Sequence, residues 1–453
     1  MTDVAFSADP TRLIISAAVG ILLLLFLIIK FKLHPVLSMM ISAIVIGIGA
    51  GMPLHLIAET VEKGVGKTLQ GIALLIGLGS MFGGILEVSG GAQKMAQTLI
   101  NKFGQKKAGL ALGLTGLVIG TTVFFEAGVV ILIPLAFNVA KQTKKSTLCY
   151  AIPLLAGLAS GYAFVPPSAG SVLVANALGV NLGVMIAVGV PVAIVSTIVA
   201  GVIWGNVIGG KIFAKLPANV EEISVEGDSK KLPPFGTVFT IILIPLVLIL
   251  LSTASSYMPI NESIKSILGF LGKPFVALTI ATLVAMYLLG TKQGYDKAQL
   301  KKILDHSLRP VGMILLVIAS GGVIRWMLQD SGLGNIIGPA LEQSGMPLII
   351  VAFLIAFLVR ASVGSSIVAM TMASGIMATM PAVADCSMLY KAAMCCAICG
   401  GATALSHVND AGFWLVGTFL EIDEKTTLKS WTIMETIIGI SGLVLGLVIS
   451  IFA

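Results

Sequence analysis

The residue with the clearest chemical implication is an arginine inside an apolar stretch. Arg360 lies between an apolar run that starts near Met346 and a short segment rich in glycine and serine. An arginine at the centre of a bilayer costs about 2.5–3.5 kcal/mol, so it needs a function or a partner. Its planar guanidinium suits a carboxylate. We therefore expect Arg360 to bind an anionic substrate, with an internal ion pair to Glu126 or Asp410 as the alternative.

Hydroxyl and amide side chains at the same positions could bind the oxygens of such a substrate. Serines at the start of a helix can equally cap it, and that alternative stays open. The predicted substrate-binding residues besides Arg360 are Ser168, Ser171, Asn176, Ser362, Ser365, Ser366 and Asn409.

Three titratable side chains stand in similar interruptions of apolar sequence. Glu126 follows Phe124-Phe125, and His407 and Asp410 belong to the segment 406–413. A carboxyl group at membrane depth can take up a proton, and histidine titrates near neutral pH. We predict that these three residues couple proton binding to transport. The alternatives are an ion-pair partner for Arg360 and a histidine that is merely structural.

These residues occupy four breaks in apolar segments. Backbone that leaves the helix at membrane depth survives only when it is buried in protein or lines a wet cavity, and half-helix ends can hold ions. We expect the four breaks to meet near the bilayer midplane. They cover residues 121–128, 164–171, 360–366 and 406–413.

Composition places the chain in a membrane. Its 453 residues are 57% apolar and only 11% charged, with a mean hydropathy of +1.03, whereas soluble proteins carry roughly a quarter charged residues. The net charge of +7 reflects basic residues in short loops, which set orientation, and no nucleic-acid partner is expected. The run 13–29 is expected to be the first membrane helix rather than a signal peptide.

The predicted fold class is an all-α polytopic membrane protein with about ten full spans and two re-entrant helical hairpins. The hairpins cover 107–141 and 346–380, because their short arms flank polar tips and an arm of 13 residues reaches roughly 20 Å. Arg325, near a span end, is expected to snorkel. The predicted full spans are 13–30, 33–51, 68–88, 148–178, 182–205, 236–252, 274–290, 307–328, 389–420 and 430–452.

The hairpin topology follows the distribution of basic residues. With the N-terminus outside, 20 of the 28 lysines and arginines fall in inside loops, as the positive-inside rule requires. Leu86–Gly90 and Ala169-Gly170 match Leu328–Gly332 and Ala411-Gly412 at one common spacing. The sequence therefore predicts two inverted repeats, 1–205 and 236–453, joined by a cytoplasmic linker at 206–235.

At these motifs the sequence resembles the gluconate permease family, the gluconate:proton symporters. The resemblance rests on Thr122–Gly128, on Arg360–Ser366 and on Ser406–Trp414, and it spans nearly the whole chain. It implies proton-coupled symport of gluconate or a related hydroxy-carboxylate across a bacterial inner membrane. It also implies an ion-transporter architecture, a homodimer and elevator-like movement. After its paired prolines this chain has Ser168-Ala169-Gly170-Ser171, where the family often has histidine and proline.

Other functions remain to be weighed against that one. The transported acid could be D-serine or glycerate, and a less favoured alternative is an ion channel, although channels generally use symmetric filters. An enzyme is not expected, because neither an H-E-x-x-H nor a G-x-S-x-G motif occurs. No cofactor or metal is predicted, and Cys396 and Cys399 are interpreted as packing residues despite their C-x-x-C spacing.

Overall fold

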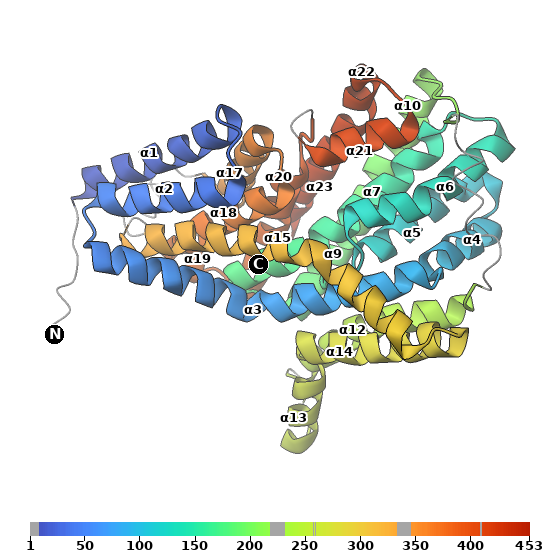
Figure 1. The fold of residues 1–453 in the computed structure, drawn as a ribbon, viewed down its shortest axis with the longest axis horizontal. Coiled ribbons are helices and arrows are strands. Elements are labelled where there is room, and N and C mark those ends of the chain that lie inside the picture. The colour runs from blue at the N-terminus through green and yellow to red at the C-terminus, as the bar shows by residue number, and fades with distance from the viewer. Residues whose placement is uncertain (1–8, 218–231, 257, 259, 333–345, 408–409) are drawn as a thin grey trace.

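The computed structural model describes residues 9–217, 232–256, 258, 260–332, 346–407 and 410–453. Throughout these ranges the regular structure is helical and no strand occurs. Figure 1 shows long helices lying side by side along the longest axis, with the short helix α13 projecting from the rest. The all-α membrane architecture predicted from composition is confirmed.

Within the described residues, eight helical segments are long and apolar enough to cross a membrane, or nine with the bent helix α3. Apolar helices α2 and α20 have 16 residues each, fewer than the about 20 residues that a full span needs. The count of about ten full spans therefore stays a prediction. The long segments are α1 (Pro10–Ile29), α3 (Leu54–Val88), α6 (Phe125–Thr143), α7 (Leu148–Phe164) with α8 (Ala169–Ala177), α9 (Leu182–Ser196) with η2 (Thr197–Ile203) and α10 (Trp204–Lys211), α12 (Phe235–Ser255), α14 (Pro274–Ala285) with η3 (Met286–Gly290) and η4 (Thr291–Gln293), α15 (Lys297–Asp330), and α22 (Glu424–Thr427) with η5 (Leu428–Thr432) and α23 (Ile433–Ser450).

Shorter helices form the hairpins and connections. Helices α5 and α6 make the first hairpin, and α17 and α18 make the second. Arms α5, α17 and α18 have 13, 16 and 13 residues, whereas α6 has 19 and could cross a bilayer by length alone. The shorter elements are α2 (Pro35–Ala50), α4 (Gly91–Phe103), η1 (Gln105–Lys107), α5 (Ala108–Gly120), α13 (Glu262–Leu271), α17 (Leu348–Val363), α18 (Ser366–Ala378), α19 (Pro381–Ala384), α20 (Met388–Thr403) and α21 (Ala411–Leu420).

Glycine allows the hairpin arms to pack closely on the broken helices. A Cβ atom added to Gly157 of α7 would lie 2.7 Å from the backbone nitrogen of Leu117 in α5. Similarly, a Cβ on Gly400 of α20 would lie 2.6 Å from the carbonyl oxygen of Gly439 in α23. Membrane helices lack a strong hydrophobic drive to associate, so close contact through small residues supplies their packing energy.

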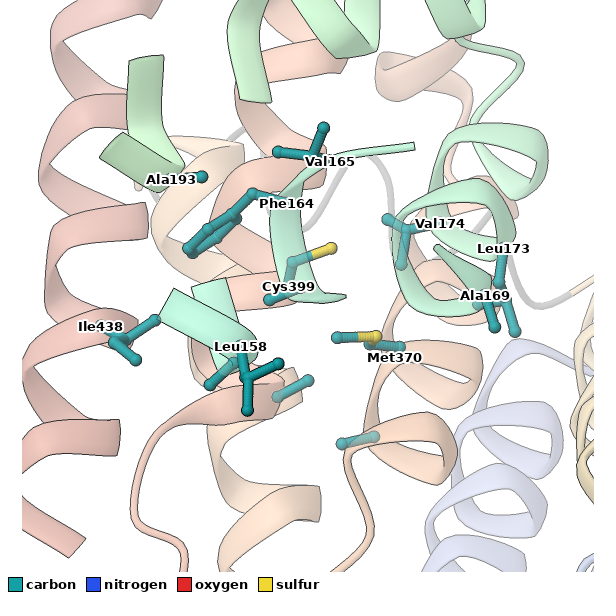
Figure 2. Packing of buried hydrophobic residues seen from close by; sticks show 14 of the residues in the cluster. Leu158, Phe164, Val165, Ala169, Leu173, Val174, Ala193, Met370, Cys399 and Ile438 are labelled. Carbon is teal, nitrogen blue, oxygen red and sulfur yellow. The ribbon is translucent and has the colours of Figure 1, made fainter. Parts of the chain in front are cut away.

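Buried apolar side chains fix the break between α7 and α8. Phe164 and Val165 at the break are almost fully buried. Figure 2 shows them with residues of α8, near Met370 of α18 and Cys399 of α20. Because of this close packing, the backbone departs from the helical conformation inside the protein, away from lipid.

Candidate functional site

A cavity of about 390 Å³, called the central cavity below, lies where three of the four breaks meet. The tips of both hairpins and the start of α21 supply most of its polar wall. Helices α7, α15, α20 and α23 and the π-helix η5 complete it. Its lining residues are Phe124, Phe125, Glu126, Ala159, Tyr162, Ile314, Arg360, Val363, Gly364, Ser365, Ser366, Ile367, Thr403, Asp410, Ala411, Gly412, Trp431 and Glu435.

Arg360 lies in the last turn of α17 and is 2% exposed. Its Nη2 lies 2.5 Å from Oδ2 of Asp410, and its Nη1 donates to the carbonyl oxygen of Gly364. Gly364 ends the helix with a φ of +76°, a conformation that glycine adopts without steric cost. The Nε of Arg360 is buried and has no hydrogen-bond partner among the residues that the structure describes. The protein therefore satisfies two nitrogens of the guanidinium, and the third donor, Nε–H, is buried.

Asp410 joins three elements at the cavity wall. Its Oδ1 accepts the backbone N–H of Gly412 at 3.1 Å and so caps α21. Its Oδ2 accepts the hydroxyl of Ser406 in addition to Arg360. Ser406 in turn accepts Nε1–H of Trp431 at 2.7 Å. The ion pair considered as the alternative role of Arg360 is thus present, and it is part of a network around the cavity.

Glu126 faces this network from the first hairpin. It stands in the first turn of α6, where the helix dipole favours a negative charge. Its side chain is open to the cavity. The neighbouring ring of Phe125 lies 5.3 Å from that of Trp431, centroid to centroid. The tip of the first hairpin therefore contacts the η5 segment directly.

A third carboxyl group in the cavity was missed by the sequence analysis. Glu435, in α23, is 3% exposed, and its Oε1 has no hydrogen-bond partner within the described structure. A lone glutamate in the apolar stretch 430–452 was a signal that could have found it. Tyr162, Thr403 and Trp431 were missed as well, because nothing distinguishes them locally from ordinary helix residues.

The predicted serines of the second hairpin separate into two groups. Ser365 caps α18 by accepting the N–H of Val368 at 3.5 Å, and both Ser365 and Ser366 line the central cavity. Ser362 instead donates to the carbonyl oxygen of Leu358 at 2.8 Å and is not among the lining residues.

The predicted residues in and after the break at 164–171 do not line the central cavity. Ser168 donates to the carbonyl oxygen of Tyr162 at 2.6 Å, and its hydroxyl lies 2.7 Å from that of Ser171. Ser168 lines a space of about 20 Å³ next to the central cavity. Asn176 lines a separate cavity, described below. Three breaks, not four, thus supply central-cavity residues directly.

The remaining predicted residues, His407 and Asn409, belong to the break at 406–413. A ring nitrogen of His407 lies 3.0 Å from the carbonyl oxygen of Ala361, beside Arg360 but outside the cavity lining. Asn409 lies outside the described residues.

The charges of the central cavity do not balance. Among the described residues that line it, Arg360 is the one cation, whereas Glu126, Asp410 and Glu435 are carboxylic acids. With all three ionised, the lining would carry a net charge of about −2, and an entering anion would be repelled. At an effective dielectric constant of 20, two unit charges 4–8 Å apart interact by about 2–4 kcal/mol. An anion can therefore occupy this cavity favourably when protons neutralise carboxyl groups.

Comparison with known proteins identifies a family model and relatives that match this chain. The family model described as GntP family permease matches residues 12–452. The low-affinity gluconate transporter of Escherichia coli K12 is 40% identical over 438 residues, covering 96% of this chain and 98% of that one. The gluconate permease of Pseudomonas aeruginosa is 35% identical, covering 97% and 98%. The Gnt-II system L-idonate transporter of Escherichia coli K12 is 32% identical, covering 95% and 97%.

Two solved structures share the fold. The YdaH transporter of Alcanivorax borkumensis has a TM-score of 0.61 and 16% identity, covering 86% of this chain and 88% of that one. MtrF of Neisseria gonorrhoeae, described as one of a class of antimetabolite efflux pumps, has a TM-score of 0.59 and 17% identity, covering 86% and 83%. At these identities the likeness concerns the arrangement of helices alone.

Proposed function

The chain belongs to the GntP permease family, a multi-pass transporter family of the inner membrane, and from this premise we propose that it carries gluconate or a closely related hydroxy-carboxylate into the cell together with protons. The observation that carries the proposal is the composition of the central cavity, one arginine facing three carboxyl groups. The arginine supplies a carboxylate site, and the acids make anion binding depend on protons.

The contacts support a sequence of binding events. In the empty cavity Arg360 is held by Asp410 and Gly364. Protons that neutralise Glu126, Glu435 or Asp410 reduce repulsion, and the substrate carboxylate then binds the free Nε–H of Arg360. Ser365, Ser366 and Thr403 offer hydroxyls for the polyol chain. Proton binding and substrate binding thus raise the affinity for each other. Release of both on the other side of the membrane then completes symport.

Cavity size favours a sugar acid over a smaller one. A volume of 390 Å³ equals roughly thirteen waters at about 30 Å³ each. Gluconate has six carbons and seven oxygens, so it fits within that space and occupies more of it than the smaller glycerate or D-serine would. The named relatives transport gluconate and L-idonate, which are both six-carbon acids of this kind.

We further propose that the chain consists of two inverted repeats, 1–205 and 236–453. Element boundaries support the pairing: α3 ends at Val88 and α15 at Asp330, and α8 begins at Ala169 and α21 at Ala411, both offset by 242 residues. The linker 206–235 then lies on the cytoplasmic side. Elevator-like movement and a homodimer belong to the same proposal.

The test is uptake by the purified full-length protein in liposomes. An inward proton gradient should drive accumulation of labelled gluconate, and a protonophore should abolish it. Replacing sodium by choline controls for sodium coupling. Accumulation that persists with the protonophore but requires sodium would refute proton coupling. The chain would still be a secondary transporter. Preferential uptake of glycerate or D-serine over gluconate would refute the proposed substrate.

A further inference from the structure

A second cavity follows the central one along the same two helices. It has a volume of about 190 Å³ and is lined from α3, α8, α15 and α18. Ile314 and Ile367 line the central cavity, and Ile318 and Thr371, four residues further along α15 and α18, line the second. Four residues of helix rise about 6 Å. The two cavities are therefore consecutive along this helix pair.

The second cavity has the opposite charge character. Lys67 of α3 and Arg325 of α15 line it, together with the amide of Asn176 and the hydroxyl of Thr68. The lining residues that the structure describes include no carboxylic acid. The Nε of Arg325 and the Oγ1 of Thr68 are buried without a hydrogen-bond partner in the described structure. A buried donor without an acceptor costs about 1–3 kcal/mol, so these groups favour a ligand that supplies oxygens.

Two glycines give these side chains access to the cavity. A Cβ atom on Gly375 would lie 3.0 Å from Cβ of Arg325, and one on Gly322 would lie 2.7 Å from Cβ of Thr68. Larger residues at either position would push the arginine or the threonine aside. The space around both donors is thus created by the neighbouring helices α15 and α18.

The neighbouring Lys63 forms an ordinary ion pair, unlike Lys67. Lys63, one turn before Lys67 on α3, lies 2.9 Å from Asp330 and 4.2 Å from the ring centre of Trp326. Its charge is therefore neutralised between α3 and α15. Lys67 has no ion-pair partner within the described part of the chain. Its charge remains available to the cavity.

We infer that this second cavity is an outer anion site, which binds the carboxylate end of the substrate before the substrate reaches Arg360. The inference rests on the proposed function for its substrate and on the predicted topology for its outer position. With two cations and no acid, the outer site holds an anion without protons. The central cavity, with three acids, requires them. The anion thus binds first at the outer site, and the protons bind afterwards in the central cavity.

Trp326 provides a local reporter, because it lines the outer site while Trp431 lines the central cavity. We would titrate the purified full-length protein with gluconate and follow tryptophan fluorescence, using Trp326→Phe to identify the outer signal and glucose as the uncharged control. Gluconate should give a saturable Trp326 response that survives Arg360→Gln. Arg325→Gln and Lys67→Gln should each raise the dissociation constant about tenfold, the usual effect of losing one charged hydrogen bond. Arg325→Lys should retain part of the affinity.

The matched control is Lys265→Gln, which removes the same charge from α13 and should leave the response unchanged. An equal response to glucose, or one unaltered in both Arg325→Gln and Lys67→Gln, would overturn the outer site. So would the absence of a Trp326 response in protein that accumulates gluconate. An Arg325-dependent response in protein that transports no gluconate would instead keep the site and refute the proposed transport. Lys67 is exposed, so its variant keeps the test valid should Arg325→Gln misfold.

Discussion

At the scale of single residues, Arg360 forms the ion pair that was the alternative to substrate binding, and its substrate-binding role stays a prediction. It pairs with Asp410 at 2.5 Å, and its buried Nε–H has no partner in the described part of the chain. Removing one member of a buried pair costs about 3–5 kcal/mol, because the other charge is left uncompensated. Loss of transport in a single Arg360 variant could therefore come from misfolding as well as from lost substrate binding.

Two variants separate these effects. Arg360→Lys keeps the charge but loses the planar fork, so we expect the KM for gluconate to rise about 10–100-fold while the protein stays folded. The double variant Arg360→Gln/Asp410→Asn removes both charges and should recover the melting temperature lost in Arg360→Gln without recovering uptake. Wild-type uptake in the folded double variant would show that Arg360 does not bind substrate.

Glu435 is predicted to carry part of the proton coupling. Glu435→Gln resembles the protonated acid at every pH, so gluconate binding should persist and become less sensitive to rising pH. At a pH difference of one unit, each coupled proton raises the inside-to-outside ratio of gluconate about tenfold, so the loss of one proton should lower that ratio about tenfold. Uptake and gluconate–gluconate exchange in liposomes measure the two properties. Exchange that fails along with accumulation would contradict a coupling role, and Glu62→Gln on the exposed face of α3 is the control.

At the scale of helices, glycine contacts hold the hairpins against the broken helices. Gly157→Val would place a Cβ 2.7 Å from the Leu117 backbone nitrogen and force α5 and α7 apart. We expect destabilisation of at least about 1–3 kcal/mol, as for other overpacked interiors. A lower melting temperature in detergent would show it. Gly210→Val is the matched control, since nothing lies within 4 Å of a Cβ there, and equal melting temperatures would refute the packing role.

At the scale of the whole molecule, the proposed topology is testable by labelling. The side chain of Glu262 is 89% exposed on α13, and Lys106 is exposed in η1. In a Cys386→Ser background, which leaves four buried cysteines, Glu262→Cys should react with an impermeant maleimide from outside intact cells. Lys106→Cys should react only after permeabilisation. The reverse pattern would invert the topology and move the proposed outer site to the cytoplasmic side.

The sequence by itself determined the membrane class, the family and the positions of the breaks. Composition and long apolar runs require helices, because backbone polar groups in lipid must be satisfied within the protein. Polar tips such as those at Glu126 and Arg360 stand out within apolar runs, so both residues could be identified locally. The motifs at 122–128, 360–366 and 406–414 also resemble gluconate permeases in their sequence, and the family is confirmed.

The tertiary structure decided which polar groups share a cavity. Glu435 and Arg360 line the same cavity although 75 residues of sequence separate them, whereas Ser168 donates to the carbonyl oxygen of Tyr162 and lies outside that lining. Arg325, expected to snorkel, lines a second cavity together with Lys67. Hydropathy reports how apolar a segment is, but not which face of a helix meets which neighbour. That choice depends on packing between distant segments, here set by glycine contacts and by the network around Asp410.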